Sequence, residues 1–237
     1  MNARRIGLLG GTFDPIHSGH LDLATAAHAV LGLTELLVIP ANVPPHRPMP
    51  STSSFHRFAM VAAAVAGRPG WQASDLELRH ETPSYTVTTL RRFHDGGYAA
   101  SELFFLIGAD AFAEIATWRD YPGLLDYAHF AVVSRPRCAV AELPARLPAL
   151  ADRMVPVARA QEVPAGPSII LIERQTADVS STAIRTTLAR GESIAGMVDP
   201  RVQQHIEQHG LYGSSTPDRR DARASADPAA GRLHGQD

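Results

Sequence analysis

Two histidines near the N-terminus carry the clearest chemical signal in this chain. His17 and His20 stand three positions apart, soon after a pair of glycines, Gly10 and Gly11. Side chains three apart at the start of a helix share one face, so both imidazoles can point at one ligand. Imidazole N–H groups donate hydrogen bonds to phosphate oxygens and stabilise charge that develops during phosphoryl transfer. The pair therefore predicts chemistry on a phosphate.

The segment around the histidines predicts a scaffold for that ligand. An apolar run over residues 6–9 indicates a strand, and an Ala- and Leu-rich pattern over residues 21–31 indicates a helix. A strand that turns through glycine into a helix exposes backbone N–H groups at the positive end of the helix dipole. Without a Cβ at Gly10 or Gly11, the backbone can approach a phosphate closely. Taken alone, the glycine pair is a weak signal, and an ordinary tight turn explains it better than a phosphate site.

Two other interpretations of the same residues stay open. Asp14, His17 and His20 have a spacing that suits a metal site, and polar residues at this point are also common helix caps.

The glycines do not fit the dinucleotide-binding fingerprint. The phosphate loop of NTPases requires a lysine, which this chain lacks.

The composition narrows the class of protein. All 22 basic residues among the 237 are arginine, which excludes a Schiff-base lysine and a lysine general base. A formal net charge of -2 gives no support for a nucleic-acid-binding or membrane-binding surface. Cys138 is the only cysteine, so the chain has no internal disulfide and no multi-cysteine zinc site. No apolar run of about 18 residues and no signal peptide are found, and we expect a cytoplasmic protein.

Apolar strands alternate with amphipathic helices along the chain. This alternation predicts an α/β fold with a mostly parallel sheet covered by helices on both faces. Further strands are expected at 35–39, 71–78, 103–107, 130–133 and 169–172, and further helices at 55–66, 85–94, 180–190 and 201–209. Prolines leave residues 139–160 unassigned. One domain is expected over residues 1–212, and residues 213–237 have the composition of a disordered tail.

Polar clusters follow several of the predicted strands. They lie at residues 10–20, 44–47, 108–110 and 134–135. The carboxyl ends of parallel strands share one edge of a sheet, and ligands bind in the crevice there. We therefore expect these clusters to converge on one site.

The sequence GGTFDPIHSGH over residues 10–20 resembles the signature of the nucleotidyltransferase superfamily, an H/T-x-G-H motif after the first strand. Within that superfamily the chain is similar to the bacterial nicotinate-nucleotide adenylyltransferase family, from Ile6 to about Tyr212. The further matching segments are Pro44-Pro45-His46-Arg47, Ser84-Tyr85-Thr86 with Thr89-Leu90, Gly108-Ala109-Asp110, Trp118, Ser134-Arg135-Pro136 and residues 179–185. A lone H-x-G-H motif would indicate only the superfamily, whereas this ordered set is specific.

The resemblance implies a Rossmann-like nucleotidyltransferase fold and a reaction in NAD biosynthesis. Nicotinate mononucleotide and ATP would give deamido-NAD and pyrophosphate. The attacking phosphate monoester is already anionic at neutral pH, so no protein base is needed to create a nucleophile. Magnesium would arrive with ATP, and no protein ligand to a metal is expected because the sequence has no closely spaced carboxylate cluster.

The resemblance also implies roles for individual residues. The catalytic residues would be His17, His20 and Arg185. The ATP-binding residues would be Gly10, Gly11, Thr12, Phe13, His17, His20, Arg47, Ser181, Thr182 and Arg185, with Arg47 where many relatives carry lysine. The nicotinate mononucleotide-binding residues would be Tyr85, Thr86, Asp110, Trp118 and Arg135.

Three rival functions remain at this point. The nearest is the same transfer to another acceptor, either nicotinamide mononucleotide or phosphopantetheine. A non-catalytic nucleotide-binding regulator would keep the fold but would not need both histidines. A metallohydrolase would use Asp14, His17 and His20 as ligands. The sequence leaves the oligomeric state open, a homo-oligomer included.

Overall fold

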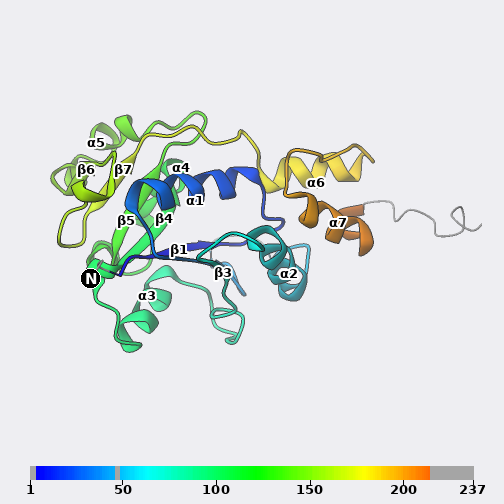
Figure 1. The fold of residues 1–237 in the computed structure, drawn as a ribbon, viewed down its shortest axis with the longest axis horizontal. Helices are drawn as coiled ribbons and strands as arrows, with labels where there is room; N and C mark the ends of the chain where they lie inside the picture. The colour runs from blue at the N-terminus through cyan, green and yellow to red at the C-terminus, as the bar shows by residue number, and fades with distance from the viewer. Residues whose placement is uncertain (1–3, 46–48, 214–237) are drawn as a thin grey trace, which may run out of the picture.

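A single seven-stranded parallel sheet forms the centre of the protein (Figure 1). The computed structural model describes residues 4–45 and 49–213, so Arg47 and most of the predicted tail lie outside the described residues. The strands are β1 (Ile6–Gly11), β2 (Glu35–Pro40), β3 (Trp71–Ala73), β4 (Leu103–Gly108), β5 (His129–Val133), β6 (Met154–Pro156) and β7 (Ile169–Ile172). They lie in the order β3-β2-β1-β4-β5-β7-β6, and all neighbouring pairs are parallel.

Helices cover both faces of this sheet, which confirms the predicted fold class. The helices are α1 (Ser18–Leu31), α2 (Ser54–Val65), α3 (Thr86–Asp95), α4 (Ala109–Phe112), α5 (Leu143–Arg146), α6 (Ser181–Ala189) and α7 (Pro200–Gln208). One apolar core contains residues of α1, α2, α6 and α7, and the other contains residues of α3 and of the short helices between β4 and β6. Among the described residues, no helix has both the length and the apolar character needed to cross a membrane.

The sequence fixes the ends of the long helices that border the site. Helix α1 stops at Gly32, whose φ of 61° is a left-handed conformation that glycine adopts at no steric cost. Helix α6 begins after Ser180, whose hydroxyl accepts a hydrogen bond from the Ala183 N–H at 3.1 Å. Helix α7 begins after Asp199, with Pro200 in its first turn.

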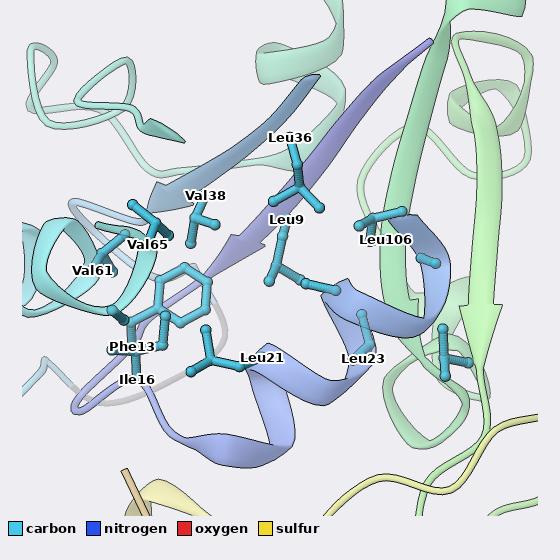
Figure 2. Packing of buried hydrophobic residues seen from close by; sticks show 14 of the residues in the cluster. Leu9, Phe13, Ile16, Leu21, Leu23, Leu36, Val38, Val61, Val65 and Leu106 are labelled. Carbon is cyan, nitrogen blue, oxygen red and sulfur yellow. The ribbon is translucent and has the colours of Figure 1, made fainter. Parts of the chain in front are cut away.

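The first core holds the β1–α1 turn in position. Phe13 and Ile16 are fully buried and pack with Leu9, Leu21 and Val61 (Figure 2). These apolar anchors flank the polar residues of the turn in sequence. Their burial, at about 25 cal/mol per Å² of apolar area, fixes the backbone from which His17 and His20 project.

The strand order creates a switch point beside this turn. From β1 the chain proceeds to β2 and β3 on one side, and it then crosses to β4 and β5 on the other. In open parallel sheets, ligands bind outside the carboxyl ends of the strands at such a point. The ends of β1 and β4 are Gly11 and Gly108, so two of the predicted polar clusters flank it.

One local expectation needs correction, and one unassigned region proves to contain a strand. The strand predicted over residues 71–78 ends at Ala73, because β3 is an edge strand that pairs with β2 at only three positions. The chain then turns, and Glu77 is buried against the Thr89 hydroxyl of α3. In the unassigned region 139–160, the short strand β6 pairs with β7 at the opposite edge of the sheet.

Candidate active site

The β1–α1 turn forms the floor of the candidate site. Phe13 has a φ of 51°, a left-handed backbone that a bulky side chain rarely adopts, and its ring is 1% exposed. Strained residues of this kind persist where packing holds them, often at functional sites. The Phe13 ring meets the His20 ring edge-on, with centroids 5.0 Å apart. The buried phenyl ring therefore sets the position of His20.

The two histidines stack on each other at the start of α1. Their ring centroids are 3.7 Å apart and their planes differ by 27°. The His17 backbone N–H donates a hydrogen bond to Nδ1 of His20 at 3.3 Å. Since Nδ1 of His20 accepts, a neutral His20 carries its proton on Nε2.

His17 is buried and uncharged at neutral pH. Burial, with a smaller contribution from the nearby Arg135 guanidinium, lowers the pKa of His17 from 6.5 to about 3. Among the described residues, neither Nδ1 of His17 nor Oγ of the adjacent Ser18 has a hydrogen-bond partner. Buried polar atoms without a protein partner are rare outside sites that receive a ligand or an ordered water.

Helix α6 joins this turn although Ser181 lies 166 positions after Pro15 in the chain. The Ser181 hydroxyl donates a hydrogen bond to the Pro15 carbonyl at 2.9 Å. The Arg185 guanidinium donates to the Asp14 carbonyl at 2.7 Å and lies 3.4 Å from the Thr182 hydroxyl. A guanidinium has five N–H donors, so Arg185 retains donors for an anion. The two predicted phosphate-binding segments thus lie side by side.

The Asp14 carboxylate acts as a structural anchor within the same turn. Its Oδ2 accepts hydrogen bonds from the Ser51 N–H at 3.0 Å and the Ser51 hydroxyl at 2.9 Å. Its Oδ1 accepts one from the Tyr212 hydroxyl at 2.7 Å. In the described part of the chain, the ligand atoms of Asp14, His17 and His20 do not converge on one point. The alternative metal site at these three residues is therefore not supported.

Arg57, from α2, ties the surrounding loops together. It is 1% exposed, and Nη1 donates to the carbonyls of Thr12 at 2.6 Å and Ala41 at 2.7 Å. Its other nitrogens lie 3.3 Å from the Thr52 carbonyl and 3.4 Å from the Asn42 carbonyl. Arg57 thereby fixes the ends of β1 and β2 relative to each other.

Arg135 connects the end of β5 to the start of α1. Nη1 donates to the Gly19 carbonyl at 3.0 Å, and Nε lies 3.9 Å from the exposed Asp110 carboxylate. A Cβ on Gly19 would lie 2.9 Å from Nη1 of Arg135 and 3.2 Å from Nδ1 of His17. Only glycine leaves room for this approach, which brings the predicted residues Asp110 and Arg135 to the edge that carries His17.

The predicted acceptor residues lie near β4 and α3. The Trp118 ring meets Phe105 of β4 edge-on at 6.1 Å, and a Cβ on Gly10 would lie 3.6 Å from that same Phe105 ring. Tyr85, with Thr86 immediately after it, precedes α3, and the Arg119 guanidinium lies 4.7 Å from the Tyr85 ring centroid. These contacts link Trp118 to β1 and Tyr85 to the segment that carries Trp118.

A cavity of about 470 Å³ lies beside the turn. Among the predicted residues, Arg185 lines it. The full lining is Ser51, Thr52, Ser53, His56, Arg185, Gly210, Leu211 and Tyr212. The cavity therefore adjoins the predicted phosphate site and is not centred on it.

Comparison with known proteins now gives the family. The model of the cytidylyltransferase-like family matches residues 8–187. A protein of Pseudomonas syringae pv. tomato described as probable nicotinate-nucleotide adenylyltransferase is 40% identical over 215 residues, covering 91% of this chain and 96% of the relative. A Roseiflexus protein of the same description is 40% identical over 218 residues, covering 90% and 100%. The chain belongs to the nicotinate-nucleotide adenylyltransferase family.

Solved structures agree with this assignment at the level of the fold. The nicotinic acid mononucleotide adenylyltransferase of Plasmodium falciparum, solved with NaAD, superposes with a TM-score of 0.66. It is 20% identical in sequence, and the match covers 89% of this chain and 98% of that one. The Rossmann-like nucleotidyltransferase fold of the family is therefore confirmed.

Several residues that support the site in this member of the nicotinate-nucleotide adenylyltransferase family are not among those predicted from the sequence. Arg57 and Tyr212 hold the loops of the site, and Ser18 and Arg119 stand next to predicted ligand-binding residues. The position of Arg57 within the Ala-rich pattern of residues 55–66 is a sequence signal for its role, since a charged side chain on an apolar helix face needs hydrogen-bond partners. Nothing local in the sequence indicates that Tyr212 reaches Asp14.

Proposed function

We propose that this protein transfers the adenylyl group of ATP to nicotinate mononucleotide, giving deamido-NAD and pyrophosphate. The observation that carries the proposal is the direct attachment of α6 to the β1–α1 turn through Ser181 and Arg185. Two helix N-termini and an arginine then face one region, where two polyanions have to be held together.

In the proposed reaction, a phosphate oxygen of nicotinate mononucleotide attacks the α-phosphorus of ATP. The new P–O bond forms as the bond to the pyrophosphate oxygen breaks, and pyrophosphate leaves with the electron pair. A phosphate monoester carries close to two negative charges at pH 7, so no proton has to be removed. The protein's task is alignment and stabilisation of charge.

His17, His20 and Arg185 would divide this task. The two imidazoles would donate hydrogen bonds to oxygens of the α-phosphate, and Arg185 would contribute a permanent positive charge. Gly10, Gly11, Thr12 and Phe13 would present the turn to ATP, with Ser181 and Thr182 at the start of α6. Arg47 is included among the proposed ATP-binding residues only because its sequence segment matches the family.

The acceptor would bind on the Trp118 side of the site. Indole is a suitable partner for the electron-poor pyridine ring. The Arg119 guanidinium beside Tyr85 adds positive charge near the predicted nicotinate-binding segment, which favours a carboxylate over an amide. Thr86, Asp110 and Arg135 complete the proposed acceptor residues.

Magnesium would enter this site bound to ATP. Mg²⁺ prefers several hard oxygen ligands in octahedral geometry. Among the described residues, Asp14 is occupied by Ser51 and Tyr212, and Asp110 is exposed opposite Arg135. We therefore expect no protein cage for the ion. When bound by the nucleotide, it would neutralise phosphate charge.

A cytoplasmic location is part of the same proposal, because the reaction consumes ATP.

The test is to incubate the purified full-length protein with ATP, Mg²⁺ and nicotinate mononucleotide. We expect equal amounts of pyrophosphate and deamido-NAD, identified by mass, and almost none from the His20→Ala variant. Release of inorganic phosphate without a dinucleotide would instead support a hydrolase. Failure to form any product would contradict the proposal.

A further inference from the structure

Three histidines from two helices converge outside the proposed active site. His56 lies in the first turn of α2, His205 lies in α7, and His209 directly follows α7. One ring nitrogen from each histidine lies within 4.8 Å of the chosen nitrogens of the other two. In the part of the chain that the structure describes, this is the one group of three or more histidine, cysteine or acidic side chains that converges in this way.

The geometry comes from the spacing in α7 and from the packing of α7 on α2. His205 and His209 are four residues apart, so their rings lie on one side of the helix with centroids 4.5 Å apart. His56 faces them, with its ring centroid 5.3 Å from that of His205 and 4.9 Å from that of His209. The two helices are neighbours at the same end of the fold (Figure 1).

The nitrogen positions suit a tetrahedral metal ion. Nδ1 of His56 lies 3.1 Å from Nε2 of His205. Two nitrogens bound to one zinc at about 2.0–2.1 Å would be roughly 3.3 Å apart, so small side-chain rotations bring these atoms to bonding positions. Zinc, nickel and copper favour imidazole, whereas magnesium and calcium favour oxygen.

We propose that His56, His205 and His209 bind one divalent transition-metal ion, Zn²⁺ by preference, that joins α2 to α7. Three protein ligands leave one tetrahedral position for water or for another small ligand. This site is independent of the proposed adenylyl transfer, because none of the three histidines has a role in that reaction.

The proposed metal would fasten two elements that support the active-site loops. Arg57, the residue after His56, holds the ends of β1 and β2. Helix α7 leads to Tyr212, which binds Asp14. His56 also lines the 470 Å³ cavity that Arg185 lines. A bound ion would thus stabilise the C-terminal segment against the site.

The test is a zinc titration of tag-free, full-length protein that has been treated with a chelator. We expect one Zn²⁺ per chain and a rise in Tm of about 5 °C when free zinc exceeds its dissociation constant a hundredfold. Cobalt in place of zinc should give the intense visible absorption of tetrahedral Co²⁺.

Variants identify the ligands. His209→Gln, at an exposed position, and His205→Gln should each weaken zinc binding at least about tenfold and abolish the cobalt spectrum. His80→Gln, at an exposed position, is the matched control and should bind zinc as tightly as the parent protein. His20→Ala should also bind zinc like the parent, which would show that His17 and His20 are not the ligands. If the protein binds no stoichiometric zinc, or if His209→Gln binds it as tightly as His80→Gln, the proposal is wrong.

Discussion

His17 combines deep burial with a lowered pKa, and this limits how it can act on a phosphate. With a pKa of about 3, it is uncharged in the free protein at neutral pH. In the proposed mechanism it would therefore offer a hydrogen bond from one ring N–H, while Arg185 and Arg135 would supply the permanent positive charge. A bound polyphosphate would raise the pKa of His17, because an anion stabilises the imidazolium.

Replacing His20 by alanine tests the proposed stabilisation of the transition state. Nδ1 of His20 accepts from the His17 backbone N–H, so in the proposed mechanism the Nε2–H of a neutral His20 would donate to the phosphate. Loss of one such donor typically costs 10²- to 10³-fold in rate, so we expect kcat to fall by about that factor while KM for ATP changes little. Steady-state kinetics check this. A rise in KM with unchanged kcat would instead make His20 a ground-state binding group.

Gly19→Ala tests the close approach of Arg135 to α1. The added Cβ would lie 2.9 Å from Nη1 of Arg135 and 3.1 Å from the Ala177 carbonyl, so the arginine has to move. We expect KM for nicotinate mononucleotide to rise and the free energy of unfolding to fall by about 1–3 kcal/mol. Gly166→Ala is the matched control, since no atom lies within 4 Å of its added Cβ. Equal behaviour of both variants in kinetics and urea unfolding would contradict the role of Arg135.

At the scale of elements, the β1–α1 turn is held by three segments distant in sequence. Ser51 and Tyr212 bind the Asp14 carboxylate, and α6 binds the Asp14 and Pro15 carbonyls. Polar groups of the turn at Asp14 and Pro15 are therefore engaged with other parts of the protein. This arrangement keeps the histidines in place without requiring the ligand to order them.

Tyr212→Phe removes one of these three ties. The Tyr212 hydroxyl donates to a carboxylate that is 5% exposed, and a hydrogen bond to a charged group contributes about 1.5–3 kcal/mol. We expect unfolding in urea to show a loss near that size. In the control Tyr98→Phe, the lost hydroxyl accepts from Arg4 at an exposed position, and we expect a change under about 0.5 kcal/mol. Similar losses in the two variants would show that the Asp14 contact does not anchor the C-terminal segment.

The elements that the sequence predicts well are those with long apolar patterns. Residues 169–172 stand out as a continuous apolar run, and all four are buried. The helix Ser18–Leu31 stands out because its Ala- and Leu-rich pattern ends at Gly32. Residues 74–78 were wrongly assigned to a strand, because their alternation reflects Glu77 turning inward toward Thr89. The ties made by Arg57 and Tyr212 could not be predicted, since they depend on tertiary contacts between residues 16 to 198 positions apart.

At the scale of the whole molecule, buried histidines make stability depend on pH. Burial, and next the charge of Arg5, lower the pKa of His129 to about 4, and neither ring nitrogen has a hydrogen-bond partner among the described residues. Histidines in the unfolded chain take up protons below about pH 6.5, whereas His129 and His17 do not until pH is well below that value. Stability is therefore expected to fall as pH drops from about 6.5 toward 4.

His129→Phe tests this explanation. The ring stacks on Phe104 with centroids 4.7 Å apart, and a phenyl ring keeps that contact without a group that titrates. The pKa of His129 is about 4 in the folded protein and about 6.5 in the unfolded chain. At pH 5 this difference lowers the free energy of unfolding by about 2 kcal/mol, at 1.36 kcal/mol per pKa unit. We expect the variant to lose about that much less stability than the parent between pH 7 and pH 5, measured by urea unfolding. An unchanged pH slope would show that His129 is not the source.

The central claim is that nicotinate mononucleotide receives the adenylyl group in the site between β1, α1 and α6. The most direct measurement compares kcat/KM for nicotinate mononucleotide and for its amide, each with ATP and Mg²⁺. The Arg119 charge beside Tyr85 predicts a preference for the acid of at least about tenfold, with deamido-NAD as the product. No dinucleotide from either substrate, or faster transfer to the amide, would contradict the account.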